Sequence, residues 1–161
     1  MKINEFDYKN KEKINKIYLH DTCINRFDIY IQDREIYIGL DEKLYGRFYE
    51  LSFKNVVKLE MYNLNLWYGG YTGTVLDIHL SNYDVKEYIH NMEKEEKEKF
   101  EKLNPYNYEF QYNEKEINKM FAVEFMLKNG DKITIICEGL IFKNLSREDA
   151  ERDDSNKNLE S

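Results

Sequence analysis

Apolar and polar residues alternate over two long segments of the chain, a pattern typical of β-strands that bury one face. The first segment is residues 18–40, where a polar break at Asp33 and Arg34 separates two alternating runs. The second segment is residues 121–140, with a break around Gly130. Each segment therefore predicts an antiparallel β-hairpin.

In the first segment, a two-residue loop at Asp33 and Arg34 places the apolar side chains of both strands on one buried face, and Cys23 joins them. The opposite face brings Tyr30 and Tyr37 together as a cross-strand aromatic pair. The pairs expected on the buried face are Ile31 with Ile36, Ile29 with Ile38, and Phe27 with Leu40.

In the second segment, the loop length decides whether the apolar residues of the two strands share a face. A two-residue turn at Asn129 and Gly130 would separate them, whereas a three-residue loop over Asn129, Gly130 and Asp131 keeps them together. We therefore predict the three-residue loop, with Gly130 or its neighbour in a left-handed conformation. The residues that then share the buried face are Val123, Phe125, Leu127, Ile133, Ile135 and Cys137.

Between the hairpins, residues 48–62 keep one alternation that Asn55 interrupts, so either one strand bends there or two short strands meet. Residues 74–80 predict a strand with Leu76, Ile78 and Leu80 inward. Residues 106–112 alternate aromatic and polar side chains and predict a further strand.

Residues 84–104 predict the main helix of the chain. Asp84 and Glu87 have the spacing of a capping box, and Pro105 ends the segment. An apolar stripe begins at Val85, whereas residues 93–99 are all charged, so we expect this charged part to project into solvent or fray.

These elements predict a mostly β fold of six to eight strands in a single domain. We expect an antiparallel sandwich or partly open barrel with one inserted helix, and an α+β sheet covered by that helix is the alternative. Residues 1–16 are a polar lead-in that is loose or forms a short helix, residues 17–145 form the domain, and residues 146–161 form a frayed or disordered tail.

The formal net charge is −7, with 24 Lys and Arg against 31 Asp and Glu. Nucleic-acid binding needs a basic footprint, so we expect no nucleic-acid partner, and a basic protein partner suits this charge better. No apolar run is long enough to span a membrane. The first residues lack the apolar stretch of a secretory signal, and the two cysteines suit a reducing compartment, so a soluble cytoplasmic protein is expected, of undetermined oligomeric state.

The densest group of chemically capable side chains is His20, Asp21 and Cys23. It could be half of a metal site or a thiol nucleophile beside a histidine, but its spacing matches no zinc motif, so we expect a structural role. Asp77 and His79 share one strand face, where an aspartate can orient a histidine base, yet no nucleophile has a spacing that links to them. We therefore expect no catalytic residues, no metal and no cofactor.

Aromatic side chains gather near glycines in residues 64–73, which predicts a loop. Trp67, Tyr68 and Tyr71 are candidate partner-binding residues, because aromatic side chains on loops often anchor a partner. The alternative is that they fold back and cover one end of the sheets.

Several short motifs resemble those of small uncharacterised bacterial β-rich proteins, some of which look like immunity proteins of toxin systems. The residues that carry this resemblance are Leu19-His20-Asp21, Cys23-Ile24, Leu51-Ser52-Phe53 with Val56, and Phe121–Leu140. The charged helix at 84–104 departs from the pattern. The resemblance implies a nonenzymatic, cytoplasmic, partner-binding role, and the most specific hypothesis is an immunity-type protein that blocks a toxin domain. A small-molecule-binding β-barrel and a metal-dependent enzyme using His20, Asp21, Cys23 and His79 are the alternatives.

Overall fold

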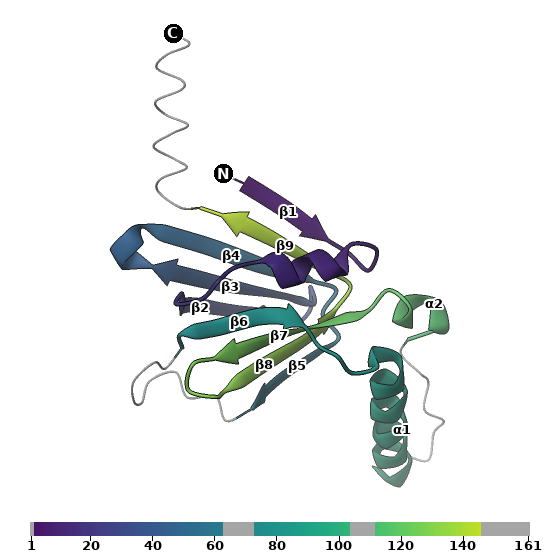
Figure 1. Ribbon diagram of the computed structural model, residues 1–161. Coiled ribbons are helices and arrows are strands. Elements are labelled where there is room, and N and C mark those ends of the chain that lie inside the picture. Colours follow the sequence, from purple (N-terminus) through teal and green to yellow (C-terminus); the bar gives the residue numbers. More distant parts are fainter. Residues whose placement is uncertain (1, 63–72, 104–111, 146–161) are drawn as a thin grey trace.

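The computed structural model describes residues 2–62, 73–103 and 112–145. The strands in these residues form two antiparallel sheets that pack face to face (Figure 1). The first sheet has five strands in the order β1 (Lys2–Phe6), β9 (Gly139–Asn144), β4 (Arg47–Lys54), β3 (Glu35–Glu42) and β2 (Cys23–Tyr30). The second has four, in the order β5 (Lys58–Tyr62), β8 (Lys132–Cys137), β7 (Phe121–Leu127) and β6 (Val75–Leu80). The helices are α1 (Val85–Leu103) and α2 (Glu114–Ile117), with 3-10 helices η1 (Lys11–Lys16) and η2 (Lys43–Tyr45).

The predicted mostly β class with one main helix is confirmed, and the sheets form an open sandwich rather than a closed barrel. The strand count in the described residues is nine, above the expected six to eight. None of the helices in the described ranges combines the length and apolar character that crossing a lipid bilayer requires.

The chain passes from one sheet to the other at two adjacent corners. β4 leads into β5 through Asn55, which has a φ of +50°, and β8 leads into β9 through Glu138. Because β4 pairs with β9 and β5 pairs with β8, a two-stranded ribbon bends through both sheets. Of the two alternatives for residues 48–62, two short strands meeting at Asn55 is the one observed.

The main core lies between the two sheets. Phe53 of β4 and Phe125 of β7 are fully buried and meet edge to face, with ring centroids 6.1 Å apart. Ile14 of η1 is also fully buried and closes one side of this core.

The first hairpin keeps Phe27, Ile36, Ile38 and Leu40 toward the core but has a different register, and Ile29, which was predicted on the buried face, is 48% exposed. Its loop spans residues 31–34, so Ile31 leaves the buried face and is 84% exposed, and the prediction that Ile31 points inward is wrong. Tyr30 and Tyr37 do meet, with ring centroids 5.5 Å apart, as predicted. The observed pairs are Ile29 with Ile36 and Phe27 with Ile38.

Two β-bulges reverse the side-chain alternation where the sequence gives a regular pattern. A bulge in β2 lies between Ile24 and Arg26, so Ile24 packs against the core and Cys23 is exposed instead of inward. A second bulge in β6, after Val75, turns Leu76 outward. The predicted inward positions of Cys23 and Leu76 are therefore wrong. Cys23 lies before the extra residue of its bulge and Leu76 is itself the extra residue, so neither follows the alternation of the residues after the bulge.

The second hairpin confirms the shared apolar face and the left-handed glycine. Gly130 has a φ of +90°. The Leu127 amide donates to the Asp131 carbonyl oxygen at 2.9 Å, so the three-residue loop is shifted by one position, to residues 128–130. β7 and β8 pair with Phe125 opposite Ile133 on the buried face.

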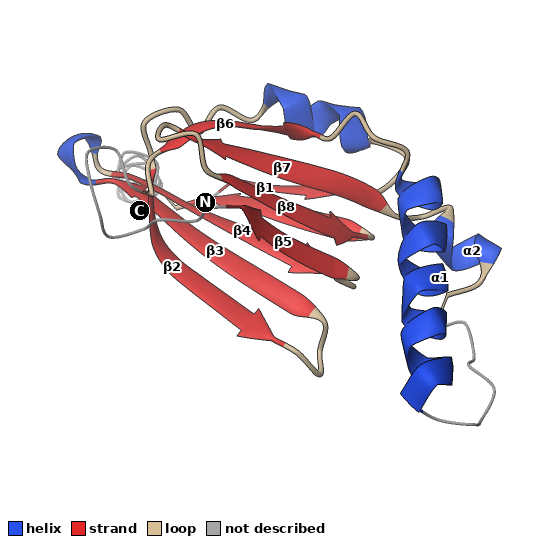
Figure 2. Ribbon diagram, turned by 90° about the horizontal axis from the view of Figure 1, so that it is seen from below, coloured by secondary structure: helices blue, strands red, loops and turns tan. Residues whose placement is uncertain are grey.

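α1 begins as predicted, since the Asp84 carboxylate accepts a hydrogen bond from the Glu87 amide at 3.1 Å. Its apolar stripe packs with α2 on the outer face of the second sheet, at one end of the strands (Figure 2). The predicted alternative of a helix that covers one face of a sheet is therefore observed at this end of the second sheet. The residues that make up this second core were not predicted from the sequence. Its buried members are Ile89, Ile117, Met120, Ala122 and Ile136.

One residue of the charged segment 93–99 is not solvated. Glu93 is only 4% exposed, and its carboxylate accepts a hydrogen bond from the Tyr112 amide at 3.2 Å. The expectation that residues 93–99 all project into solvent is therefore wrong at this position.

The lead-in at residues 1–16 belongs to the sandwich. β1 pairs along β9, and η1 confirms the alternative of a short helix. Most of the strand expected at residues 106–112, and the tail at 146–161, lie outside the described residues.

Candidate functional site

His20, Asp21 and Cys23 lie just before and at the start of β2, where they connect it to β6 and β7. The His20 Nδ1–H donates to the Leu76 carbonyl oxygen at 2.9 Å, and the Cys23 Sγ lies 3.5 Å from the Thr74 Oγ1. His20 Nε2 lies 3.6 Å from the Asp21 carboxylate. His20 and Asp21 therefore meet, whereas Cys23 contacts a different residue.

Asp21 also pairs with Lys128 on the β7–β8 loop. The hydrogen bond from Lys128 lowers the pKa of the Asp21 carboxyl, although burial opposes this effect. Asp21 has a φ of +69°, the left-handed region that Asp tolerates better than most residues. Its contacts fix the start of β2 against the second sheet.

Asp77 and His79 share the outer face of β6, as predicted. His79 Nδ1 lies 3.1 Å from an Asp77 carboxylate oxygen, and His79 Nε2 lies 3.4 Å from Glu124 of β7. Glu124 in turn lies 3.7 Å from Lys132 of β8. The sequence did not point to Glu124 here, because its approach to His79 depends on the register between β6 and β7.

The remaining histidine and cysteine do not join these groups. His90 of α1 pairs with Glu114 of α2 at 2.9 Å. Cys137 is fully buried in the main core, and burial raises the pKa of its thiol. In the described ranges, the structure gathers no three His, Cys, Asp or Glu side chains in a group that could hold a metal ion.

Trp67, Tyr68 and Tyr71, the partner-binding candidates from the sequence, lie outside the described residues. The described surface has several concave regions elsewhere.

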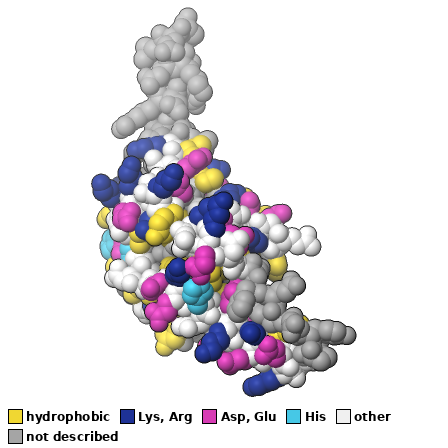
Figure 3. Space-filling view, turned by 90° about the vertical axis from the view of Figure 1, so that its right-hand side faces the viewer, with side chains coloured by type: hydrophobic (Ala, Val, Ile, Leu, Met, Phe, Trp, Pro, Cys, Tyr) yellow, Lys and Arg dark blue, Asp and Glu magenta, His cyan; other side chains and the backbone are white. Residues whose placement is uncertain are grey.

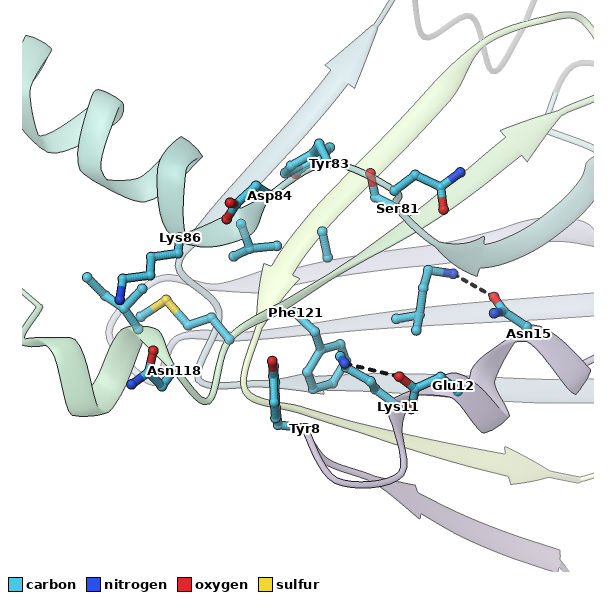
Figure 4. A pocket seen from close by; sticks show the side chains of 16 residues that line it. Tyr8, Lys11, Glu12, Asn15, Ser81, Tyr83, Asp84, Lys86, Asn118 and Phe121 are labelled. Carbon is cyan, nitrogen blue, oxygen red and sulfur yellow. Dashed lines mark hydrogen bonds and ion pairs between the residues drawn. The ribbon is translucent and has the colours of Figure 1, made fainter.

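The first is a cavity of about 570 Å³ between η1, the β6–α1 connection and the start of β7 (Figure 4). Its polar groups already contact neighbours that hold these elements together. Lys11 lies 3.2 Å from Glu12, and Lys86 pairs with Glu114 at 2.6 Å. The Asn15 side chain accepts a hydrogen bond from the Leu80 amide at 2.8 Å.

The second is an apolar opening between the ends of β2 and β5, with a volume of about 280 Å³. We call it the β2–β5 mouth, and its apolar lining includes Ile29, Ile31, Val56, Val57, Leu59 and Tyr112. Two of these side chains are exposed to solvent: Ile31 is 84% exposed and Ile29 is 48% exposed.

Arg34 supports the rim of the mouth. Its Nε–H donates to the Val56 carbonyl oxygen at 3.2 Å, and its guanidinium lies 5.5 Å from the centre of the Tyr112 ring. On one side of the mouth, Arg34 therefore contacts Val56 and Tyr112. On the other side, Ile29 and Ile31 are exposed.

The mouth also lies beside the outer strands of both sheets. β2 ends the first sheet and β5 ends the second. Within the described part of the chain, β2 has a neighbour on its outer side only near Cys23, which bridges to Thr74. Outer strands carry unpaired backbone groups that can pair with another chain.

The face that carries α1 and α2 has a different character. Lys and Arg side chains alternate there with Asp and Glu, and apolar atoms occur in small separate areas (Figure 3). Such a mixed surface is ordinary for a soluble domain.

No family model matches the chain, and no curated protein matches it. Among solved structures, it is similar to an uncharacterized protein from Neisseria gonorrhoeae, with a TM-score of 0.44 and 10% identity over 90% of this chain and 100% of that chain.

Proposed function

We propose that this chain is a nonenzymatic protein-binding module that binds its partner at the β2–β5 mouth. The observation that carries the proposal is the pair of exposed isoleucines, Ile29 and Ile31, beside the outer strands of both sheets. An extended partner segment can add to a sheet edge through backbone hydrogen bonds, while its side chains fill an adjacent apolar pocket. The mouth offers both kinds of contact.

The charge of the chain supports a basic partner. At a net charge of −7, long-range attraction speeds encounter with a basic protein and slows encounter with an acidic one. Apolar contacts in the mouth would then hold the complex when salt screens the charges.

The resemblance to immunity proteins supports a narrower form of the proposal, in which the partner is a toxin domain. An inhibitor of this type acts by occupying a surface and needs no chemistry of its own. The chain would then suppress the activity of its partner in proportion to the complex formed.

The test compares two exposed aliphatic side chains of the same size, Ile31 and Leu44, at different positions. Ile31 is 84% exposed in the mouth, and Leu44 is 85% exposed in η2 at the opposite end of the β3–β4 hairpin. Ile31→Lys and Leu44→Lys make the same charge change, and neither removes a buried side chain. Each variant and the unmodified chain are used to capture partners at about 0.5 M salt.

We expect one stoichiometric basic protein with the unmodified chain and with Leu44→Lys, and loss of that protein with Ile31→Lys. Equal capture by both variants would rule out the mouth. For the narrower form, co-expression should protect cells from the captured protein, and Ile31→Lys should not; a harmless captured protein would refute the immunity role while leaving the binding role standing.

A further inference from the structure

A third concave region carries a charge opposite to that of the whole chain. It lies where the inner face of the first sheet extends past the main core, below η1, and has a volume of about 540 Å³. We call it the basic groove. Its cationic residues are Lys2 of β1, Lys13 and Lys16 of η1, and Arg47 of β4.

The strand register shows how the groove changes character along its depth. At the deep end, Phe6 lies opposite Leu140, which lies opposite Phe53, and all three side chains are buried. At the outer end of the same strands, Lys2 lies opposite Asn144, which lies opposite Tyr49. The groove therefore runs from an apolar floor to a cationic rim.

Aromatic side chains form the middle of the groove. The rings of Tyr49 and Phe142 are stacked, with centroids 5.6 Å apart and planes inclined by 19°. Ile17 and Tyr18, which follow η1, complete the lining on the other side. These groups form an apolar surface for the body of a ligand.

The positive charge at the rim has little opposition. The described residues that line the groove include no Asp or Glu, although acids outnumber bases in the chain. Arg47 is paired with Glu42 at 3.2 Å. Within the described ranges, Lys2, Lys13 and Lys16 form no ion pair.

From this arrangement we propose that the basic groove binds a small amphipathic organic anion. Its aromatic or aliphatic body lies against Phe142 and Ile17, and its carboxylate, sulfonate or phosphate lies at Lys13 and Lys16. The volume is within the ~300–1,000 Å³ of small-molecule sites. A nucleic-acid strand would extend beyond this volume onto a surface of net negative charge, which disfavours it. The groove is separate from the β2–β5 mouth, so this proposal does not depend on the proposed partner.

The test uses two fluorescent probes that share an aromatic body. Anilinonaphthalene sulfonate is an anion, and N-phenylnaphthylamine is its neutral counterpart. Each is titrated into the full chain, into Lys13→Gln/Lys16→Gln, and into the control Lys94→Gln/Lys119→Gln, which makes the same charge change on exposed lysines outside the groove. Melting temperatures confirm that both variants fold.

We expect the anionic probe to bind the unmodified chain and the control equally, and to bind Lys13→Gln/Lys16→Gln about tenfold more weakly, since each exposed charge pair contributes up to a few-fold in affinity. The neutral probe should bind all three chains equally weakly. Ile31→Lys should leave the anionic probe unaffected, which excludes the mouth as its site.

Three results would overturn the proposal. These are an unchanged affinity of the anionic probe in Lys13→Gln/Lys16→Gln, an equal loss in the lysine control, or equal affinities of the two probes for the unmodified chain. The first would place the probe elsewhere, the second would reduce the effect to net charge, and the third would leave the cationic rim without a role.

Discussion

The docking of α1 and α2 on the second sheet can be tested at a single isoleucine. Ile136 of β8 points to the outer face of its sheet, yet it is 1% exposed because the two helices cover it. Ile141 of β9 also points to the outer face of its own sheet, where no helix among the described residues covers it, and it is only partly buried. Both residues lie on strands with a partner on each side.

Replacing Ile136 with Ala removes about three carbon groups at ~0.8 kcal/mol each, and the unfilled space adds to this loss. We expect the free energy of unfolding to fall by about 3 kcal/mol. The same change at Ile141 should cost about 1 kcal/mol, since its side chain is partly in water already. Because the loss of β-propensity is the same in both variants, the difference of about 2 kcal/mol reports the cover supplied by the helices.

Urea unfolding followed by circular dichroism measures both variants, and an unchanged slope with denaturant confirms that stability alone has changed. A loss of 3 kcal/mol lowers the melting temperature by roughly 6–12 °C in a chain of this length. If Ile136→Ala and Ile141→Ala lose the same free energy within about 0.5 kcal/mol, the helices do not cover the outer face and the second core is wrong.

Three further predictions follow from individual side chains. Asn55→Val should lower the free energy of unfolding by about 1–2 kcal/mol, because a branched residue is strained at a φ of +50°, and Asn55→Gly should not. Glu93→Leu should be about 1–3 kcal/mol less stable than Glu93→Gln in denaturant titrations, since only Gln keeps an acceptor for the Tyr112 amide. Burial, with two nearby carboxylates, raises the pKa of Tyr83 to about 12 from its ordinary 10, so the folded chain keeps a proton that the unfolded chain loses. Stability should therefore fall between about pH 10 and pH 12, and Tyr83→Phe should flatten that fall in unfolding titrations.

Period-two alternation identified most of the buried faces, because a side chain on a half-buried strand must point either to the core or to water. This is why Phe125 and Ile133 were placed correctly on the same inner face, although the shifted loop changes which residues lie opposite one another. The corner at Asn55 was also visible, since a polar residue interrupted an apolar face there. The sequence could not decide between a bend and two strands, because both break the alternation.

Bulges and loop lengths were not visible in the same way. Because the bulge in β2 adds one residue, Ile24 packs against the core in place of Cys23. Both side chains are small or apolar enough to suit either face, so the sequence pattern did not reveal the bulge. The Ile31 side chain was assigned to the core because it is apolar. A four-residue loop places it in water instead.

The packing of α1 and α2 on the second sheet did have a signal in the sequence, one that period-two alternation does not capture. Residues 133–137 are almost continuously apolar, which is typical of a strand buried on both faces. Ile136 is the residue that this second burial requires. The partner of that face, α1, follows β6 rather than β8 in the chain, so its identity depends on tertiary structure.

The sequence did not point to the β2–β5 mouth as the candidate binding surface. The sequence predicted partner binding at Trp67, Tyr68 and Tyr71, which are aromatic residues near glycines and lie outside the described residues. The mouth brings together β2, β5 and Tyr112, which are far apart in sequence. Only the packing of the two sheets places them beside one another.

Hydrogen–deuterium exchange of the chain with and without its captured partner tests the central claim most directly. The account predicts that added protection falls on the amides of β2 and of the adjoining loop, residues 24–34, and on β5, residues 58–62. The β3–β4 turn around Leu44 should exchange at the same rate in both states. Protection at that turn or on α1, with none at β2 and β5, would contradict binding at the mouth.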